Sequence, residues 1–257
     1  MKEQLTIIKV GGKIVEEQES LHNLLQRFAQ LPGHKLLVHG GGRSATHMAT
    51  RLGIESQMVN GRRITDADTL MVVTMVYGGL VNKNIVAGLQ ALGVNALGLT
   101  GADLNVIRSV KRPVKEVDYG FVGDVEKVDA SILGDLIAKG VVPVMAPLTH
   151  DGKGHLLNTN ADTIAGETAK ALASQFDVTL MYCFEKKGVL RREDDDDSVI
   201  PYLNRMDFNT LVADGTIQGG MIPKLENALA AIDAGVSRVV ITRADAIDGT
   251  SGTSIEA

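Results

Sequence analysis

Residues 5–12 read LTIIKVGG, an apolar, β-branched run that ends in two glycines with Lys9 just before them. A short apolar run closed by a turn signal is typical of a buried strand. Glycines at its carboxyl end let backbone N–H groups approach a ligand, and open parallel sheets bind ligands at that end. The stretch therefore predicts a first strand whose lysine faces a phosphoryl group; the alternative is an ordinary surface lysine.

A second glycine loop follows the next apolar run. Residues 35–38 predict a strand that leads into His39-Gly40-Gly41-Gly42, and residues 43–52 predict a helix. Two successive strand, loop and helix units predict a parallel sheet with right-handed crossovers and both glycine loops at one edge. A shared phosphate or carboxylate site is expected there.

The rest of the chain continues the alternation of strands and helices. Strands are expected at 95–100, 141–146, 177–183 and 236–242, and helices at 129–140, at 161–173 and after Gly219-Gly220. Residues 106–128 predict a hairpin on the rim. No linker rich in proline or serine interrupts this order, so any two lobes are expected to share one continuous sheet.

A long helix is expected after Thr65, which forms a possible capping box with Asp68. Gly78 and Gly79 lie inside this helix, where each glycine costs about 1 kcal/mol relative to alanine. They favour close packing by another helix, from this chain or from a second subunit. The alternative is a break between two shorter helices.

Composition excludes several classes of protein. The 257 residues are 44% hydrophobic and 22% charged with a net charge of −5, and Lys and Arg form no basic block, so nucleic acid is a disfavoured partner. The single cysteine, Cys183, cannot form an intramolecular disulfide and is expected in the core, as in a reducing compartment. The first residues contain no signal pattern, and no apolar run approaches the roughly 20 residues that a membrane span needs. A cytoplasmic protein is therefore expected.

Most familiar catalytic motifs are missing from the sequence. There is no GxxxxGK[ST], no GxGxxG after the first strand, no HExxH among the six histidines and no GxSxG. A protein-held metal is therefore not expected, and the acidic run 194–197 reads as a solvated loop. What remains is an electrostatic assembly of the two glycine loops with Lys9, Arg63, Lys224 and the polar groups of 158–162.

Six motifs in order resemble those of the N-acetylglutamate kinases of the amino-acid kinase superfamily. They are Lys9-Val10-Gly11-Gly12, His39 to Gly42, Asn60-Gly61-Arg62-Arg63, Gly120-Phe121-Val122-Gly123, Asn158 to Asp162 and Gly219-Gly220-Met221-Ile222-Pro223-Lys224. The resemblance implies an α/β fold: a three-layer αβα sandwich on a mainly parallel open sheet of about eight strands. It also implies an N-terminal lobe, 1–174, for the acyl-amino acid and dimerisation, and a C-terminal lobe, 175–257, for ATP.

The implied reaction is ATP-dependent phosphorylation of the γ-carboxylate of N-acetyl-L-glutamate, the second step of arginine synthesis. By this resemblance Lys9 and Lys224 neutralise the transferring phosphoryl group and Asp162 orients them. Mg²⁺ would be held mainly by the nucleotide. As alternatives, Lys224 is a surface charge and Asp162 a partner of its helix dipole.

The resemblance also implies the binding residues. Arg63 matches the arginine that grips the substrate α-carboxylate and Asn158 an amide that bonds the acyl-amino acid, while their alternatives are a surface charge and a turn residue. The amides of Gly11, Gly12 and Gly41 are implied to cradle oxygens, with Gly11 and Gly12 as phosphate-binding and Gly41 and Gly42 as substrate-binding residues. The nucleotide is expected at Glu185, Lys186, Lys187, Gly188, Thr216, Ile217 and Gln218.

Three positions depart from the family pattern. The loop at 185–188 begins with Glu185 where Asp and a small residue are usual. Arg62 replaces an apolar residue, which raises the hypothesis of a charged acyl group such as succinyl. Leu104 stands where glycine is common. Members inhibited by arginine carry an additional N-terminal helix, so a homodimer insensitive to arginine is expected here.

Two alternatives remain open. One is a kinase of the same fold with another acceptor, such as carbamate, an amino acid or UMP. The other is a non-catalytic sensor, which the presence of Lys9, Asp162 and Lys224 disfavours.

Overall fold

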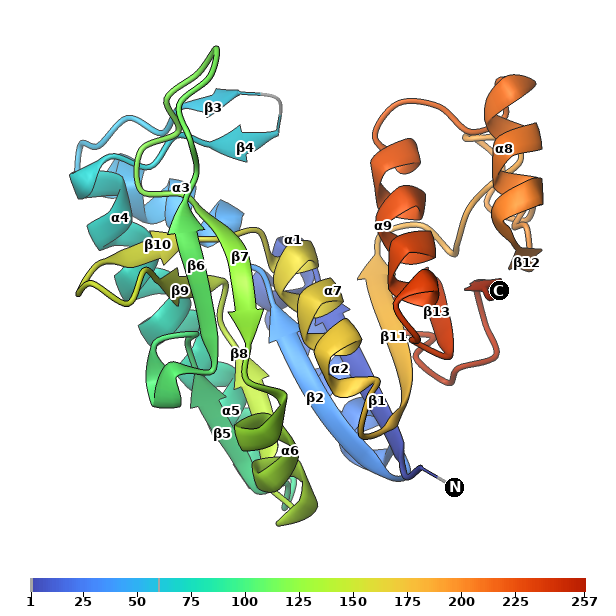
Figure 1. Cartoon of the computed structure of the whole chain (residues 1–257), viewed down its shortest axis with the longest axis horizontal. Helices are drawn as coiled ribbons and strands as arrows, with labels where there is room; N and C mark the ends of the chain where they lie inside the picture. Colours follow the sequence, from blue (N-terminus) through green and yellow to red (C-terminus); the bar gives the residue numbers. More distant parts are fainter. Residues whose placement is uncertain (1, 60) are drawn as a thin grey trace.

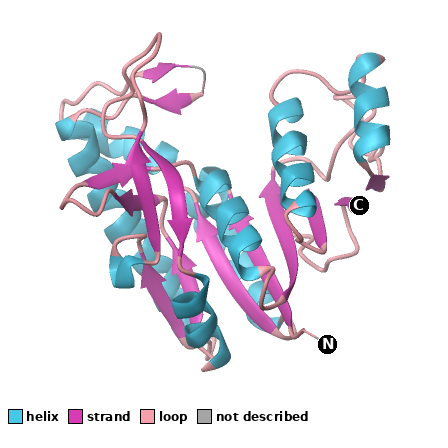
Figure 2. Cartoon of the chain, in the orientation of Figure 1, coloured by secondary structure: helices cyan, strands magenta, loops and turns pink. Residues whose placement is uncertain are grey.

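An eight-stranded sheet runs through the middle of the computed structural model, which describes residues 2–59 and 61–257 (Figures 1 and 2). The strands lie in the order β12 (Tyr202–Leu203), β14 (Thr253–Ile255), β13 (Arg238–Arg243), β11 (Asp177–Phe184), β1 (Gln4–Val10), β2 (His34–His39), β8 (Val142–Met145) and β5 (Ala96–Leu99). From β13 to β5 every neighbouring pair is parallel, whereas β14 runs antiparallel to β13.

Helices cover both faces of this sheet. One face carries α1 (Gly12–Glu16), α2 (Gln18–Gln30), α3 (Gly42–Arg51), α4 (Ala67–Val73), the π-helix η1 (Thr74–Val81) and α5 (Asn82–Ala91). The other carries α6 (Ala130–Ala138), α7 (Ala161–Leu172), α8 (Arg205–Ala213) and α9 (Met221–Asp233). The predicted three-layer αβα sandwich on a mainly parallel sheet is confirmed.

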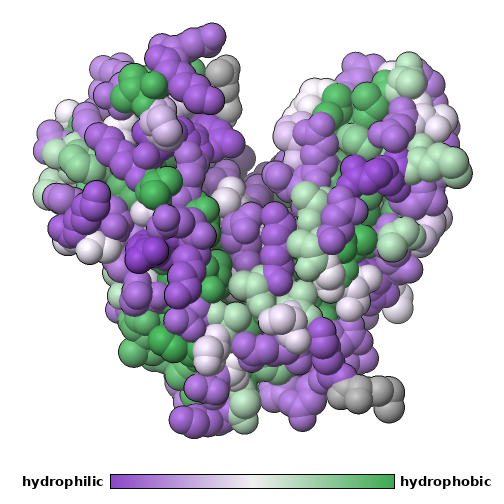
Figure 3. All heavy atoms as spheres, in the orientation of Figure 1, coloured by the Kyte–Doolittle hydropathy of each residue, from purple (hydrophilic) through white to green (hydrophobic). Residues whose placement is uncertain are grey.

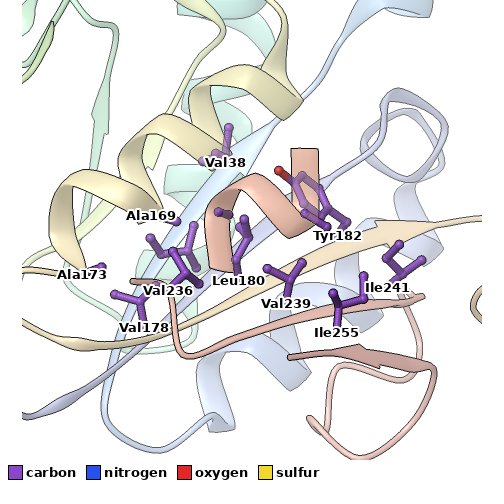
Figure 4. Close-up of a cluster of buried hydrophobic side chains, with 14 of the residues drawn as sticks. Val38, Ala169, Ala173, Val178, Leu180, Tyr182, Val236, Val239, Ile241 and Ile255 are labelled. Atoms are coloured by element: carbon purple, nitrogen blue, oxygen red, sulfur yellow. The ribbon is translucent and has the colours of Figure 1, made fainter. Parts of the chain in front are cut away.

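Side chains of β1 alternate between the two faces of the sheet, which places Lys9 on the α7 face. Successive side chains of a strand point to opposite faces. Leu5 and Ile7 enter the cluster on the α7 and α9 face, whereas Ile8 and Val10 enter the cluster on the α2 and α3 face. Lys9 follows the parity of Ile7 and therefore points toward α7. Figure 4 shows the neighbouring part of this core, with Leu180, Tyr182, Val239 and Ile241 from β11 and β13.

A smaller sheet forms the rim on one side of the ligand edge. Its order is β10 (Leu156–Asn158), β9 (Leu148–His150), β6 (Ile107–Lys111) and β7 (Gly123–Val128). The antiparallel pair β6 and β7 confirms the hairpin predicted at 106–128. A two-stranded ribbon, β3 (Met58–Val59) and β4 (Arg62–Arg63), stands beside it. Between β5 and β6 lies a short 3₁₀ turn, η2 (Asp103–Asn105).

The helix that follows Thr65 differs from the sequence prediction at its start. Asp66 caps α4, because its side chain accepts a hydrogen bond from the Thr69 amide. Thr65 instead is fully buried and donates its hydroxyl to the Arg63 carbonyl. The N-cap is therefore Asp66 rather than the predicted Thr65, because the Asp66 side chain reaches the amide of Thr69 in the first turn.

The same helix is continuous through its two glycines. Residues Ala67–Ala91 form one run, with η1 in π geometry at its centre. A Cβ on Gly78 would lie 3.4 Å from Leu148 Cδ1, so within this chain the close neighbour of Gly78 is β9. Packing of this helix against a second subunit stays a prediction. A Cβ on Gly79 would meet no described atom within 4 Å. The predicted long helix is therefore confirmed, and the alternative of a break between two shorter helices is wrong.

This helix is also long and apolar enough, by length and composition alone, to cross a membrane. No such run is expected from the sequence alone. Val72, Val76 and Ile85 are buried in the core cluster beneath the sheet, so the apolar residues serve the interior of the fold. Met71, Met75 and Leu80 remain about half exposed.

Several short elements were missed, among them α1, α8, β3, β4, β9, β10, β12 and β14. Helix α1 has five residues and starts at Gly12, inside the predicted strand and turn. Strand β12 has two residues and depends on pairing with β14, which is distant in sequence. Such elements are stabilised by tertiary contacts rather than by a local pattern.

Candidate active site

The two glycine loops touch at the carboxyl ends of β1 and β2. The Gly40 amide donates to the Val10 carbonyl at 3.0 Å. A Cβ on Gly40 would lie 3.2 Å from the Gly12 nitrogen, and a Cβ on Gly12 would lie 3.5 Å from the Gly42 nitrogen. At Gly40 a side chain would require the Gly12 backbone to shift, whereas a Cβ on Gly12 would make ordinary van der Waals contact. The predicted proximity of the two loops is thus present.

Lys9 forms an ion pair with Asp162 at this edge. Its Nζ lies 2.7 Å from Asp162 Oδ1, and the lysine is only 8% exposed. Asp162 stands in the first turn of α7, where the Asn160 side chain caps the helix by accepting from the amides of Asp162 and Thr163. Burial and pairing exclude the alternative that Lys9 is an ordinary surface lysine.

Lys224 approaches the same group of residues from the first turn of α9. Its Nζ lies 4.1 Å from the centre of the Phe184 ring, and the Lys9 Nζ lies 5.3 Å from that centre. Burial lowers the pKa of Lys224 below its ordinary value; the Asp162 charge opposes this and the Lys9 charge adds to it. The two ammonium groups therefore share one aromatic ring, and Asp162, the ion-pair partner of Lys9, also acts on Lys224 through its charge.

A small cavity of about 200 Å³ opens beside the second glycine loop. Arg63 contributes a side chain that is only 8% exposed. Its NH2 donates to the Gly42 carbonyl and to Thr46 Oγ1, and its NH1 donates to Ser56 Oγ, each at 2.8 Å. These bonds fix the guanidinium against the loop. The cavity is also lined by Gly40, Gly41, Met58, Gly61, Arg62, Tyr77, Arg112, Val122, Asn158 and Asn160, among others.

The amide of Asn158 has a defined orientation in this cavity. Because the Thr65 hydroxyl donates to the Arg63 carbonyl, its oxygen accepts from Asn158 Nδ2 at 3.0 Å. Asn158 Oδ1 is then left to accept a hydrogen bond from a ligand. A secondary amide N–H, as in an N-acyl amino acid, would supply one.

A larger cavity of about 610 Å³ adjoins the small one. Both are lined by Gly42, Met58 and Arg63, so they form one continuous cleft. Figure 3 shows the hollow between the arm that carries β3 and β4 and the arm that carries α8 and α9. The larger cavity is also lined by Gly11, Gly12, Lys13, Arg43, Phe184, Glu185, Lys186, Gly188, Met221 and Lys224, among others.

Some predicted nucleotide residues lie outside the lining of the larger cavity. Lys187 Nζ instead pairs with Asp197 at 2.7 Å, in the acidic run. Thr216, Ile217 and Gln218 form the turn between α8 and α9, and Ile217 belongs to the core. Their role in nucleotide binding stays a prediction.

Other lining residues were missed by the sequence analysis. Phe184 follows Cys183, which is buried as predicted and whose pKa burial raises to about 12. Tyr77 comes from η1 and would lie 2.9 Å from a Cβ on Gly41. Phe184 could have been found from its position at the end of the strand that precedes 185–188. No sequence pattern points to Tyr77, because the direction of its side chain depends on the π-helix geometry of η1.

Metal-ligating side chains do not cluster in residues 2–59 and 61–257, where no group of three His, Cys, Asp or Glu could hold an ion. The cleft is instead rich in cations and backbone amides. Such a site suits a polyanion.

The model of the amino acid kinase family matches residues 4–243. The chain belongs to the amino acid kinase family. The first residue of the motif Asn60-Gly61-Arg62-Arg63 lies outside the described part of the structure.

Relatives within the amino acid kinase family extend over the whole chain. The chain is 77% identical over 256 residues to the acetylglutamate kinase of Bacteroides thetaiotaomicron and, over the same length, 77% identical to that of Phocaeicola vulgatus; each match covers 100% of both chains. The crystal structure of smu.665 from Streptococcus mutans superimposes with a TM-score of 0.80 at 28% identity and covers 98% of each chain.

Proposed function

We propose that this protein is an acetylglutamate kinase, which transfers the terminal phosphoryl group of ATP to the γ-carboxylate of N-acetyl-L-glutamate in arginine biosynthesis. The observation that carries the proposal is the ion pair of Lys9 with Asp162 and the shared contact of Lys9 and Lys224 with the Phe184 ring, at the sheet edge where the two glycine loops meet. The 77% identity to acetylglutamate kinases supports the choice of acceptor.

The reaction joins two anions. A γ-carboxylate oxygen forms a bond to the γ-phosphorus, and the bond from that phosphorus to the β–γ bridging oxygen breaks, which yields ADP and an acyl phosphate. Little covalent help is needed, so alignment and charge stabilisation set the rate. Lys9 and Lys224 neutralise the phosphoryl oxygens, and Asp162 holds both ammonium groups in place.

The small cavity is proposed to hold the acyl-amino acid. Arg63 would receive the α-carboxylate, since its guanidinium is fixed by three hydrogen bonds and loses little freedom on binding. Asn158 Oδ1 would accept the amide N–H of the substrate. Gly41 and Gly42 supply amides beside the γ-carboxylate.

The larger cavity is proposed to hold ATP. Gly11 and Gly12 supply amides for the phosphates, and Glu185, Lys186 and Gly188 line the region assigned to the nucleoside. Bound Mg²⁺ would neutralise part of the β- and γ-phosphate charge.

The test of this function is ADP release with a panel of acceptors: N-acetylglutamate, N-succinylglutamate, glutamate, aspartate, carbamate and UMP. We expect turnover with an N-acyl-glutamate only. Turnover with carbamate or UMP alone would contradict the proposal, and an absence of turnover with every acceptor would favour the sensor.

A charged acyl group is a second candidate, because Arg62 lines the same cavity as Arg63 although its own side chain is exposed. Arg62 could pair with the free carboxylate of an N-succinyl group. The kcat/KM values for N-acetyl- and N-succinyl-glutamate in the wild type and in Arg62→Leu decide between them. An acetyl preference in the wild type removes the second candidate.

We further propose a cytoplasmic homodimer whose N-terminal lobe, 1–174, binds the acyl-amino acid and whose C-terminal lobe, 175–257, binds ATP. Met71, Met75 and Leu80 give the helix of 67–91 an exposed apolar surface, which a second copy would cover. Sedimentation should show a dimer for the wild type and a monomer for Leu80→Glu. Met206→Glu, a change at an exposed methionine of α8, should leave the dimer intact.

A further inference from the structure

His39 and Asn82 form a buried polar pair behind the second glycine loop. His39 ends β2 and is fully buried, and Asn82 begins α5 and is 1% exposed. Nδ1 of His39 lies 2.7 Å from the Gly40 carbonyl oxygen, and its Nε2 lies 3.2 Å from Asn82 Nδ2. Neither residue lines the two cavities described above.

The orientation of the Asn82 amide follows from its other partners. Lys83 Nζ lies 3.0 Å from Asn82 Oδ1 and can only donate, whereas the Val144 carbonyl lies 2.9 Å from Nδ2 and can only accept. The NH₂ group of Asn82 therefore faces both the Val144 carbonyl and the imidazole.

This orientation fixes the tautomer of His39. Since Asn82 Nδ2 donates, Nε2 has to accept, and the proton of the neutral imidazole is on Nδ1, where it is donated to the Gly40 carbonyl. Burial lowers the pKa of His39 to about 4; the bond to Gly40 opposes this and the charge of Lys83 adds to it. At neutral pH the ring stays neutral.

The Gly40 carbonyl in turn sets the direction of the next amide. Across a planar trans peptide the C=O and the following N–H point in opposite directions. A Gly40 carbonyl held toward the buried His39 therefore turns the Gly41 N–H away from it, and Gly41 lines the small cavity. The Gly40 amide is held as well, by the Val10 carbonyl.

We propose that His39 is a positioning residue, which with Asn82 behind it holds the Gly40 peptide so that the Gly41 amide faces the reacting carboxylate and phosphoryl oxygens. The inference rests on the proposed kinase function. Gly98 leaves the space that the Asn82 side chain occupies. A Cβ on Gly98 would lie 1.9 Å from Asn82 Oδ1.

The first experiment reads the tautomer in the wild-type protein by ¹⁵N NMR of the imidazole nitrogens. At pH 7 we expect a protonated Nδ1 and an unprotonated Nε2, unchanged down to about pH 5. A proton on Nε2, or a ring that titrates near its ordinary value, would overturn the inference. This measurement needs no catalytic activity, so it judges the pair even if the wild type turns over no acyl-glutamate, a result that would contradict only the proposed function.

The second experiment separates the two ring nitrogens. In His39→Asn the side-chain NH₂ can take the place of Nδ1 and keep the bond to Gly40, whereas in His39→Gln it reaches the place of Nε2 and loses that bond. We expect kcat within about threefold of wild type for His39→Asn and about 10- to 100-fold lower for His39→Gln. The KM for ATP should change less than about threefold in both.

Equal losses of kcat in the two variants, or a larger loss in His39→Asn, would overturn the positioning role, because a merely structural residue would not distinguish the nitrogens. Gly98→Ala reaches the pair through Asn82 without changing His39 and covers the case in which a His39 variant does not fold. It should lower kcat about tenfold with little change in the KM for ATP. Wild-type kcat in Gly98→Ala would equally contradict the inference.

Discussion

Lys9 and Asp162 meet across the layer boundary between β1 and α7, with Nζ 2.7 Å from Oδ1. The parity of β1 turns Lys9 toward α7, and the cap at Asn160 places Asp162 in the first turn of that helix. Lys224 arrives separately, on α9, and shares the Phe184 ring with Lys9. Three elements distant in sequence thus set the charge of the cleft.

Removing either ammonium should slow transfer rather than weaken binding. Lys9→Met and Lys224→Met keep most of the side-chain volume but lose the charge opposite the phosphoryl oxygens. We expect kcat to fall about 10²- to 10³-fold, as for removal of one stabilising donor in other enzymes. Steady-state ADP release measures this, with Lys139→Met at the exposed end of α6 as the control. A loss confined to KM would contradict the assigned role.

Asp162→Asn should shift the alkaline limb of the pH–rate profile. The charge of Asp162 raises the pKa of Lys224, which burial lowers. Without that charge the pKa of Lys224 falls further, so the active ammonium form is lost at a lower pH than in the wild type. The profile of kcat between pH 7 and 10 shows the shift. Glu167→Gln, on the same helix, should leave the limb in place, and an unchanged limb in Asp162→Asn would refute the coupling.

His39 should make folding stability depend on pH in the acid range. Its pKa is about 4 in the folded protein and about 6.5 when unfolded. The stabilisation is present above pH 6.5 and is lost as the pH falls toward 4, because only the unfolded chain binds the proton there; the full effect is about 3 kcal/mol. Urea unfolding at pH 7 and pH 4.5 should show a smaller difference in His39→Asn than in the wild type. Equal differences would place the titration elsewhere.

Leu104 is held in a backbone conformation that favours glycine. Its φ is +52° in η2, and its side chain is 56% exposed. The left-handed conformation costs a non-glycine residue about 1–2 kcal/mol, and glycine adds about 0.5–1 kcal/mol of unfolded-state entropy. Leu104→Gly should therefore raise the free energy of unfolding by roughly 0.5–1 kcal/mol.

The matched control for Leu104 is Gly93→Ala. Gly93 has a φ of +76°, and an added Cβ would meet no described atom within 4 Å. The alanine should lower the free energy of unfolding by about 1 kcal/mol. Chemical denaturation measures both variants; a destabilised Leu104→Gly would show that the leucine side chain makes a contact of greater value than its strain.

The elements that the sequence predicted best are those with a strong local signal. The apolar run ending at Gly11 and Gly12 and the second run ending at Gly40 to Gly42 sufficed to predict parallel strands with adjoining glycine loops. The family motifs then extended the fold to the whole chain. The three-layer architecture, the buried Cys183 and the rim hairpin were predicted correctly.

The parts that were missed depend on contacts that a linear pattern does not contain. The π geometry of η1 points Tyr77 at Gly41, and no residue spacing announces it. The Phe184 ring contacts both Lys9 and Lys224, and the contact with Lys224 depends on the packing of α9 against the sheet. The unexplained Leu104 of the sequence became intelligible once its φ was known.

The eight-stranded sheet has a mechanical consequence. Strands β1 and β11 are paired along their whole common length, and they join the arm of the glycine loops to the arm of α9. Any approach of the two arms therefore has to twist or flex hydrogen-bonded strands instead of rotating about a loose joint. Such a deformation stores elastic strain in the sheet. Relief of that strain would favour reopening of the cleft for product release.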